Sequence, residues 1–234
     1  MIALPAPAGF AAGSTTRLLA HDDLPVNDAL RRLASALGAP GAVTIRARQV
    51  HGRDVRIAES IAPAPGEDLV LGDADAVLTD RRGVLVAVVT ADCVPLVLVD
   101  EVSGWMAAVH AGWRGTAARI VDAVLDAFVD RGVPAERLVA SFGPSIGRDS
   151  YEVGPEVVQA LAASGDSAGA AVSPGRGDRS YVDVAAFNEA ALRRRGVRTI
   201  HVSTHDTYAD PVRFPSYRRD GARTGRIVTG VIRL

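Results

Sequence analysis

Two spacings of hydrophobic residues recur along this chain, and they separate predicted helices from predicted strands. Apolar residues three and four positions apart, ended by glycine or proline, predict helices, whereas short runs rich in valine and leucine predict buried strands. The first pattern predicts helices over 27–37, 116–130, 155–163 and 184–195, with Asn27 and Asp183 as N-caps of the first and last. The second pattern predicts strands over 43–48, 75–78, 84–90, 94–99, 105–110, 138–142, 199–203 and 226–232.

Two long segments interrupt these patterns. Residues 58–72 are rich in proline, glycine and acidic residues, and residues 164–179 are rich in glycine, serine and alanine. Both compositions predict surface loops, the second of them mobile. Because strands and helices are interspersed without an internal repeat or a linker, we expect one domain of the α/β (α+β) class over residues 1–234.

The composition is that of an ordinary globular protein, with 48% hydrophobic and 23% charged residues. No apolar run approaches the roughly 20 residues that span a bilayer. Residues 1–13 contain two prolines and no basic residue, which argues against a secretory signal, so we expect a cytoplasmic protein. The formal net charge of −1 gives no general attraction to nucleic acid or to a membrane surface.

The basic residues and the single cysteine exclude several kinds of reaction and of binding site. All 26 basic residues are arginine, so a lysine Schiff base or a lysine general base is excluded. The single cysteine, Cys93, excludes an intrachain disulfide and any cysteine-rich metal site. An anionic substrate would therefore be held by arginine, by backbone N–H groups or by a metal.

A hairpin offers one way to bring Cys93 and His110 together. If strands 94–99 and 104–109 pair around a four-residue loop, Val99 lies opposite Gly104 and Cys93 lies opposite His110. Directly opposed residues share a face of the sheet, with Cβ atoms about 4.5–5.5 Å apart. That separation suits two ligands of one tetrahedral zinc ion.

His51, just after the strand 43–48, would be the third ligand, and three protein ligands leave a position open for water or substrate. Asp92 could support the site from beside Cys93. Alternatives remain open at this point. Pro95 could introduce a bulge that breaks the hairpin register. A lone cysteine is commonly a buried small hydrophobic residue, and an isolated histidine is commonly structural.

Five segments carry more specific residue patterns. They are Arg48-Gln-Val-His-Gly52, Thr90-Ala-Asp-Cys-Val-Pro-Leu96, His110-Ala-Gly-Trp-Arg-Gly115, Gly143-Pro-Ser-Ile-Gly147 followed by Tyr151-Glu-Val-Gly154, and Ser216-Tyr-Arg-Arg-Asp220 with Thr224-Gly-Arg226. Together, in this order, they closely resemble the YfiH family. Its members are described as laccase-like multicopper polyphenol oxidoreductases, purine nucleoside phosphorylases and peptidoglycan editing factors. The resemblance covers residues 31–234.

The resemblance implies a layered α-β-β-α sandwich, like the catalytic domain of cytotoxic necrotizing factor. It implies a zinc site at His51, Cys93 and His110. The implied activity is phosphorolysis of purine nucleosides (adenosine, inosine, guanosine and methylthioadenosine), with adenosine deamination beside it. The expected partners are a nucleoside and phosphate, without nucleic acid or membrane, for a chain that is a monomer or a homodimer.

The matching motif positions give the expected site residues. Those expected in catalysis are His51, Cys93, His110 and Arg114, and those expected in substrate binding are Arg48, Gln49, Asp92, Trp113, Ser145, Tyr217 and Arg218. Arg114 stands at the start of a predicted helix, where free N–H groups favour an anion such as phosphate. Trp113 and Tyr217 are candidate stacking surfaces, and Arg218, Arg219 and Arg226 could add positive charge. Equally, Trp113 could belong to the core, and Arg218 and Arg219 could form surface ion pairs.

Three other functions compete with this one. Five histidines are too few for the copper centres of a multicopper oxidase. A single blue-copper site is also disfavoured, because Met106 lies four strand residues, about 13 Å, from His110. A metal-free cysteine hydrolase would use Cys93 as nucleophile and His110 as base, and would have no need of His51. The third possibility is a role in editing peptidoglycan precursors.

Overall fold

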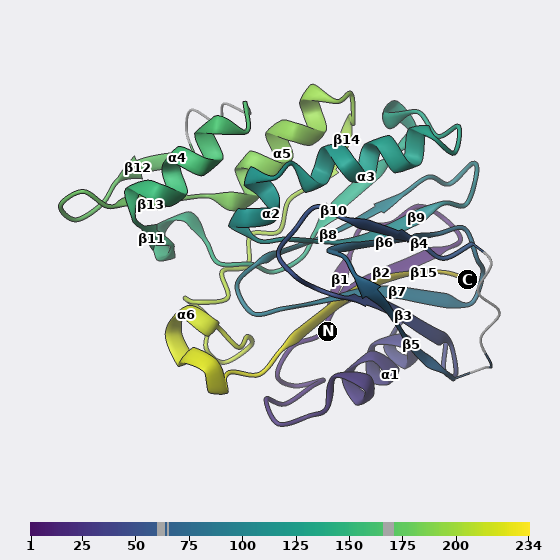
Figure 1. Ribbon diagram of the computed structural model, residues 1–234. Coiled ribbons are helices and arrows are strands. Elements are labelled where there is room, and N and C mark those ends of the chain that lie inside the picture. Colours follow the sequence, from purple (N-terminus) through teal and green to yellow (C-terminus); the bar gives the residue numbers. More distant parts are fainter. Residues whose placement is uncertain (60–63, 65, 166–170) are drawn as a thin grey trace.

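The computed structural model describes residues 1–59, 64, 66–165 and 171–234, and Figure 1 shows its four layers. Two six-stranded sheets lie face to face, one helix covers the outer face of the first sheet, and a group of helices covers the outer face of the second. This arrangement confirms the predicted α-β-β-α fold with mixed sheets. Within the described ranges, no helix is both long and apolar enough to cross a membrane.

The first sheet has, in spatial order, β1 (Ile2–Leu4), β2 (Phe10–Ser14), β15 (Ile227–Arg233), β7 (Val84–Thr90), β3 (Val43–Arg48) and β5 (Asp68–Asp73). The second has β14 (Thr199–His201), β10 (Val139–Phe142), β8 (Val94–Val99), β9 (Met106–Ala111), β6 (Ala76–Thr79) and β4 (Val55–Ile57). A small third sheet has β11 (Glu152–Val153), β13 (Ser180–Val182) and β12 (Val172–Pro174). The α-helices are α1 (Val26–Ala36), α2 (Trp113–Ala117), α3 (Ile120–Val129), α4 (Pro155–Ala163), α5 (Val184–Arg194) and α6 (Tyr217–Asp220). Short 3₁₀ segments lie at Ala135–Arg137, Arg148–Ser150 and Gly221–Arg223.

Strand β7 explains why the layers stack in this order. Its Val84, Val86 and Val88 point into the core between the two sheets, whereas Leu85 and Ala87 point to the opposite face and pack with α1. Strand β8 divides its side chains in the same way between the inter-sheet core and the core under the second group of helices. Because successive side chains of a strand point to opposite faces, an apolar run without a polar break forms a strand that is buried on both sides.

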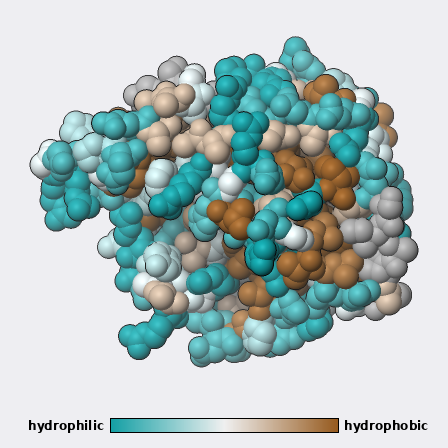
Figure 2. Space-filling model, viewed as in Figure 1, coloured by the Kyte–Doolittle hydropathy of each residue, from teal (hydrophilic) through white to brown (hydrophobic). Residues whose placement is uncertain are grey.

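The surface reflects the same layering. Figure 2 shows one face of the molecule, on which hydrophilic residues cover most of the area. Hydrophobic residues gather near the centre and right of this view, where Figure 1 shows strands of both sheets. The apolar character of the interior layers therefore extends to the surface along the strands.

Most predicted elements are confirmed. Strands β3, β7 and β8 and helix α4 have the predicted bounds, and other strands and the helices at 26–36 and 184–194 agree to within two residues. Asp183 caps α5, since its carboxylate accepts a hydrogen bond of 3.0 Å from the N–H of Ala186. The prediction for Asn27 is wrong. Helix α1 begins directly after Pro25, so that Asn27 lies inside its first turn and makes no cap.

The predicted helix over 116–130 is two helices. Helix α2 ends at Ala117 and α3 begins at Ile120, because Arg119 between them has a left-handed backbone with φ of 65°. The Arg119 guanidinium pairs with the Asp122 carboxylate, 3.0 Å away in the first turn of α3. Neither glycine nor proline marks this break, so the apolar spacing continues across it in the sequence.

The two predicted loops contain strands. Strand β5 begins within 58–72 and pairs in parallel with β3, and β12 lies within 164–179 and pairs with β13. Residues 60–63, 65 and 166–170 lie outside the described residues. The mobility predicted for the second loop, which contains residues 166–170, stays a prediction. Strands β1, β2, β4, β11 and β13 and the short helix α6 were not predicted. Each of these strands is only two to five residues long, so it depends on its partner strand more than on its own pattern.

Candidate metal and substrate site

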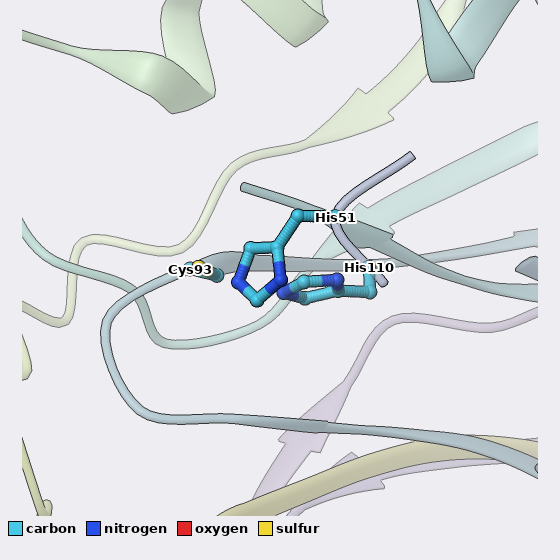
Figure 3. A group of neighbouring side chains, drawn as sticks. All are labelled: His51, Cys93 and His110. Carbon is cyan, nitrogen blue, oxygen red and sulfur yellow. The ribbon is translucent and has the colours of Figure 1, made fainter. Parts of the chain in front are cut away.

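The side chains of His51, Cys93 and His110 point toward one another from three separate segments of the chain (Figure 3). Their ligand atoms all lie within 4.8 Å of one another. The imidazole rings of His51 and His110 stand edge to face, with centroids 4.8 Å apart. Within the part of the chain that the structure describes, this is the cluster suited to hold a metal ion, and it contains the three predicted ligands.

Each of the three residues lies near the end of a strand. His110 is the second-last residue of β9, on the inter-sheet face that it shares with Met106 and Ala108, and is only 2% exposed. Cys93 directly precedes β8 and is half-buried. His51 follows β3 and is exposed, with a left-handed backbone of φ 60°. The cluster therefore lies where the core between the sheets ends and reaches solvent.

The hairpin register that predicted this meeting is wrong by two residues. Strands β8 and β9 pair Val99 with Met106 and Pro95 with His110, so Cys93 is not directly opposite His110. The turn is longer than predicted because the Asp100 carboxylate accepts a hydrogen bond of 3.0 Å from the N–H of Ser103 and holds the chain in a wider loop. A shift of two residues leaves each side chain on its original face, and the ligands still converge.

The carboxylate that supports the cluster is Asp75, which was not predicted. Asp75 is buried and accepts a hydrogen bond of 2.8 Å from Nδ1 of His110. It also accepts hydrogen bonds from the backbone N–H groups of His51 (3.0 Å) and Gly52 (2.6 Å). With the proton of His110 on Nδ1, its Nε2 is the ring nitrogen available to a metal or to the thiol. One carboxylate thus orients two of the three candidate ligands.

The charges in the cluster favour a thiolate. Burial raises the pKa of the Cys93 thiol, but hydrogen bonds and charge interactions with His110 and His51 outweigh it and lower the pKa to about 7. Burial lowers the pKa of His110, but Asp75 and Cys93 outweigh it and raise the pKa to about 9. The thiolate is both the metal-binding and the nucleophilic form of cysteine, so the site suits either role.

Asp92 has a different role from the one expected. Its carboxylate accepts hydrogen bonds from Thr207 Oγ1 (2.6 Å), Ser216 Oγ (3.0 Å) and the backbone N–H of Arg218 (2.6 Å). It has a left-handed backbone with φ of 90°. Asp92 therefore ties the start of α6 and the segment around Thr207 to the turn before Cys93, and the contact with the histidine cluster is made by Asp75 instead.

A cavity of about 590 Å³ opens beside the cluster. It lies where strands β3 and β7 separate, because their pairing ends at Ile45 and Val86 although both strands continue. Its wall contains all three members of the cluster. The other residues that line it are Val26, Arg46, Ala47, Arg48, Gln49, Val89, Thr90, Ala91, Tyr217 and Arg226. Of the predicted substrate-binding residues, Arg48, Gln49 and Tyr217 are therefore in the cavity wall.

Gln49 also connects the two separating strands. Its Nε2 donates to the carbonyl of Val89 (2.7 Å) and its Oε1 accepts from the N–H of the same residue (2.8 Å). The side-chain amide thus replaces the backbone pairing that has ended. Arg48 is exposed and forms an ion pair with Asp73 at the cavity rim.

Trp113 and Arg114 lie next to a second, smaller cavity. This cavity of about 40 Å³ is lined by Asp92, Cys93 and Trp113, together with Val94, Ala111, Gly112, Ile146, Tyr151 and Val184. The guanidinium of Arg114 lies over the Trp113 ring, 4.3 Å from its centroid, and Arg114 is exposed. Trp113 packs against the core under the helices. The structure therefore does not bring either residue to the wall of the larger cavity.

Ser145, Arg218 and Arg219 line neither cavity. Ser145 is buried, and its carbonyl accepts a hydrogen bond of 3.0 Å from the N–H of Thr207. Arg218 donates to the carbonyl of Glu152 (2.7 Å). Arg219 donates to the carbonyls of Thr207 (2.9 Å), Tyr208 (2.8 Å) and Phe214 (2.9 Å) and pairs with Asp220. These contacts hold together the segments around the site.

Comparison with known proteins identifies the family. Residues 14–234 match the family described as multi-copper polyphenol oxidoreductase laccase. A solved structure, the YfiH protein of Bacillus licheniformis, superimposes with a TM-score of 0.85 at 25% identity, over 95% of this chain and 92% of that one. The chain belongs to the YfiH (laccase-like) family. This confirms the resemblance drawn from the five sequence segments.

Two relatives in the YfiH family carry names of activities. A purine nucleoside phosphorylase of Deinococcus radiodurans is 40% identical over 221 residues, which are 94% of this chain and 82% of the relative. An adenosine deaminase named RL5, from an unknown prokaryotic organism, is 36% identical over 219 residues, which are 91% of this chain and 83% of the relative. Both alignments extend over nearly the whole chain.

Three residues of the site were missed by sequence reasoning, and each has a local signal. Asp75 directly precedes the buried strand β6, where an acidic residue needs a partner. Arg46 lies between Ile45 and Ala47 of β3, both buried in the inter-sheet core. Thr90 ends the otherwise apolar strand β7. In this member of the YfiH family, a polar residue within or beside a buried strand marks the site.

Proposed function

We propose that this protein is a zinc-dependent purine nucleoside phosphorylase. The observation that carries the proposal is that the His51–Cys93–His110 cluster opens directly onto the larger cavity. A cavity of about 590 Å³ is within the range of about 300–1,000 Å³ typical of small-molecule sites, and can hold a nucleoside together with phosphate. The relative named purine nucleoside phosphorylase supports the same reaction class.

The residues present fit a zinc ion. A thiolate and two imidazole nitrogens are preferred zinc ligands, and three protein ligands leave a coordination position free, as in catalytic sites. Asp75 holds His110 in the tautomer that presents Nε2, which is the usual arrangement around a zinc-bound histidine. Zinc bound by these three residues would supply a Lewis acid in the wall of the larger cavity.

Copper fits less well. The blue-copper arrangement of two histidines and one cysteine has a methionine as a distant axial ligand. Met106 is fully buried in the core between the sheets, and the five histidines of the chain cannot furnish the centres of a multicopper oxidase. We therefore favour zinc over the copper of the family's laccase description.

In phosphorolysis, an oxygen of phosphate forms a bond to C1′ of the ribose while the bond between C1′ and the purine nitrogen breaks. The electron pair of that bond goes to the purine, which takes up a proton, and the products are ribose 1-phosphate and the free base. Tyr217 is exposed in the wall of the larger cavity and can stack against the base. The arginines in the same wall can hold the phosphate.

Metal analysis and a nucleoside assay on untagged protein test this proposal. We expect about one zinc per chain and purine release from inosine or adenosine that requires added phosphate. His51→Ala and Cys93→Ser should lose both the zinc and the activity. His201→Ala, which removes an exposed histidine from the edge strand β14, should change neither. Purified protein without zinc, or purine release that is independent of phosphate, would contradict the proposal.

One observation favours a second candidate, a metal-free cysteine hydrolase. The three side chains match the parts of a catalytic triad: Cys93 as nucleophile, His110 as base and Asp75 as the carboxylate that orients the base. His51 separates the two candidates, because a dyad of Cys93 and His110 does not need it. Retained activity in His51→Ala together with rapid alkylation of Cys93 by iodoacetamide would favour the hydrolase. In the same assays, inosine formed from adenosine without phosphate would reveal the deamination named in the relative RL5.

A further inference from the structure

Three arginines, Arg46, Arg48 and Arg226, line the larger cavity of a chain that is almost neutral. Among the described residues, no aspartate or glutamate lines it. The whole chain has 26 basic and 27 acidic residues. A concave wall that carries charge of one sign concentrates ligands of the opposite sign. The electrostatics of the cavity therefore favour an anion.

Two of these three arginines are committed to other groups. Arg48 forms its ion pair with Asp73, and Arg226 donates to the carbonyls of Thr224 (2.8 Å) and Gly225 (3.0 Å). Arg46 differs from both. Its Nε is buried, and no group among the described residues accepts a hydrogen bond from it. A buried N–H group without an acceptor is costly, so the Nε of Arg46 marks a place where a ligand would supply the missing acceptor.

Thr90 gives a second, independent observation. Its side chain is only 2% exposed, lines the same cavity from β7, and its Oγ1 has no hydrogen-bond partner among the described residues. Arg46 lines the cavity from β3, the strand that separates from β7 at this point. Thr90 leaves the sheet on the inter-sheet face, like Val86 and Val88, and Arg46 leaves it on the face of α1, so the two side chains border the cavity from opposite sides of the gap between the strands.

We propose that Arg46, with Thr90 on the other side of the gap between the strands, forms the subsite for inorganic phosphate. This inference rests on the proposed function and moves the phosphate away from Arg114, which does not line the larger cavity. The guanidinium donates to the phosphate oxygens with full charge complementarity, and the threonine hydroxyl adds a neutral hydrogen bond. Arg46 is thereby expected to govern the binding of phosphate and not that of the nucleoside.

Phosphate binding and steady-state kinetics of the full-length, zinc-loaded protein test the subsite. The variants are Arg46→Gln, Arg46→Lys and Thr90→Val, and the control is Arg198→Gln, an exposed arginine that lines neither cavity. Binding is measured without nucleoside, as the thermal stabilisation by inorganic phosphate relative to chloride at equal ionic strength. A parallel titration with a nucleoside 5′-monophosphate separates free phosphate from a phosphate ester.

We expect Arg46→Gln to raise the KM for phosphate about ten- to a hundred-fold, to leave the KM for the nucleoside nearly unchanged, and to abolish the stabilisation by phosphate. Arg46→Lys should restore part of the phosphate affinity, and Thr90→Val should weaken it by a smaller factor. An unchanged phosphate KM in a folded Arg46→Gln protein would overturn the proposal, as would stabilisation by the monophosphate alone. An unaltered phosphate KM in Thr90→Val would remove Thr90 from the subsite.

The outcomes also separate this inference from the proposed function. If the wild-type protein cleaves no nucleoside but is stabilised by phosphate through Arg46, the subsite is supported and the phosphorylase is not. If it cleaves nucleosides and Arg46→Gln behaves like the control, the phosphorylase is supported and the subsite is wrong.

Discussion

Replacing Asp75 by asparagine tests how strongly one buried carboxylate organises the site. One carboxylate oxygen accepts from His110 Nδ1 and the N–H of His51, and the other accepts from the N–H groups of Gly52 and Val50. Asparagine has one oxygen and one NH₂ group. Whichever way the amide is turned, one pair of donors then faces another donor. Asp75→Asn therefore removes two accepted hydrogen bonds while changing the side-chain volume very little.

The size of the effect follows from these contacts. Hydrogen bonds to a charged group contribute about 1.5–3 kcal/mol each, so the loss of two lowers the free energy of unfolding by about 3 kcal/mol or more. For a domain of this size, each kcal/mol corresponds to about 2–4 °C, which predicts a fall in Tm of about 6 °C or more. The variant also loses the orientation of His110 and His51. Loss of such a supporting carboxylate lowers zinc affinity about 10- to 100-fold.

Two measurements on Asp75→Asn separate stability from metal binding. Thermal unfolding of the metal-free protein gives the stability, and competition with a chelator gives the zinc affinity. Asp73→Asn is the matched control, because Asp73 is two residues away, its side chain is 45% exposed, and it pairs with Arg48. It should leave both quantities nearly unchanged. A variant at Asp75 that binds zinc as tightly as the wild type would refute the role assigned to this carboxylate.

Three further predictions concern stability. Burial raises the pKa of Asp122, but three arginines outweigh it and lower the pKa to about 2. Asp122→Asn should thus lower the free energy of unfolding by about 2 kcal/mol at pH 7. In unfolding titrations this difference should shrink as the pH falls from about 4 through about 2. The control Asp126→Asn, at an exposed position, should show no such pH dependence. Gly230→Ala puts a Cβ only 2.7 Å from the carbonyl oxygen of Val86 in the adjacent strand, so unfolding in urea should show a loss of about 1–3 kcal/mol. Phe128→Ala empties a fully buried position under α3 and should cost about 3–5 kcal/mol in the same assay.

The central strands could be predicted from the sequence because burial on both faces leaves a strong pattern. Strands β7 and β8 are apolar along nearly their whole length, and their predicted bounds are correct. Strand β2 shows the opposite case. Its residues are Phe-Ala-Ala-Gly-Ser, which have little strand preference of their own, yet it pairs with β1 and β15. Its conformation is determined by partners far away in the sequence, and no local pattern contains that information.

The sequence predicted that His51, Cys93 and His110 meet, and they do, although the hairpin register used for Cys93 and His110 was wrong. The register between β8 and β9 differs by two residues from the predicted one, and the period of a strand is also two. An error of two residues therefore leaves Cys93 and His110 on the same face. An error of one residue would have turned one ligand into the opposite core. Asp75 was missed because its partner His110 lies on a neighbouring strand 35 residues away.

The sequence could not predict which arginine of the site lacks a hydrogen-bond or ion-pair partner, because such partners come from the tertiary structure. In the sequence, Arg114 has the stronger case, since it lies in a specific motif at a predicted helix start. In the structure, Arg48 pairs with Asp73, and Arg226 donates to two backbone carbonyls. By contrast, the Nε of Arg46 has no acceptor among the described residues. The buried Nε–H of Arg46 without an acceptor lowers the stability of the fold, and a bound anion would offset that cost. Phosphate should therefore stabilise the wild-type protein more than Arg46→Gln, whichever reaction the site catalyses.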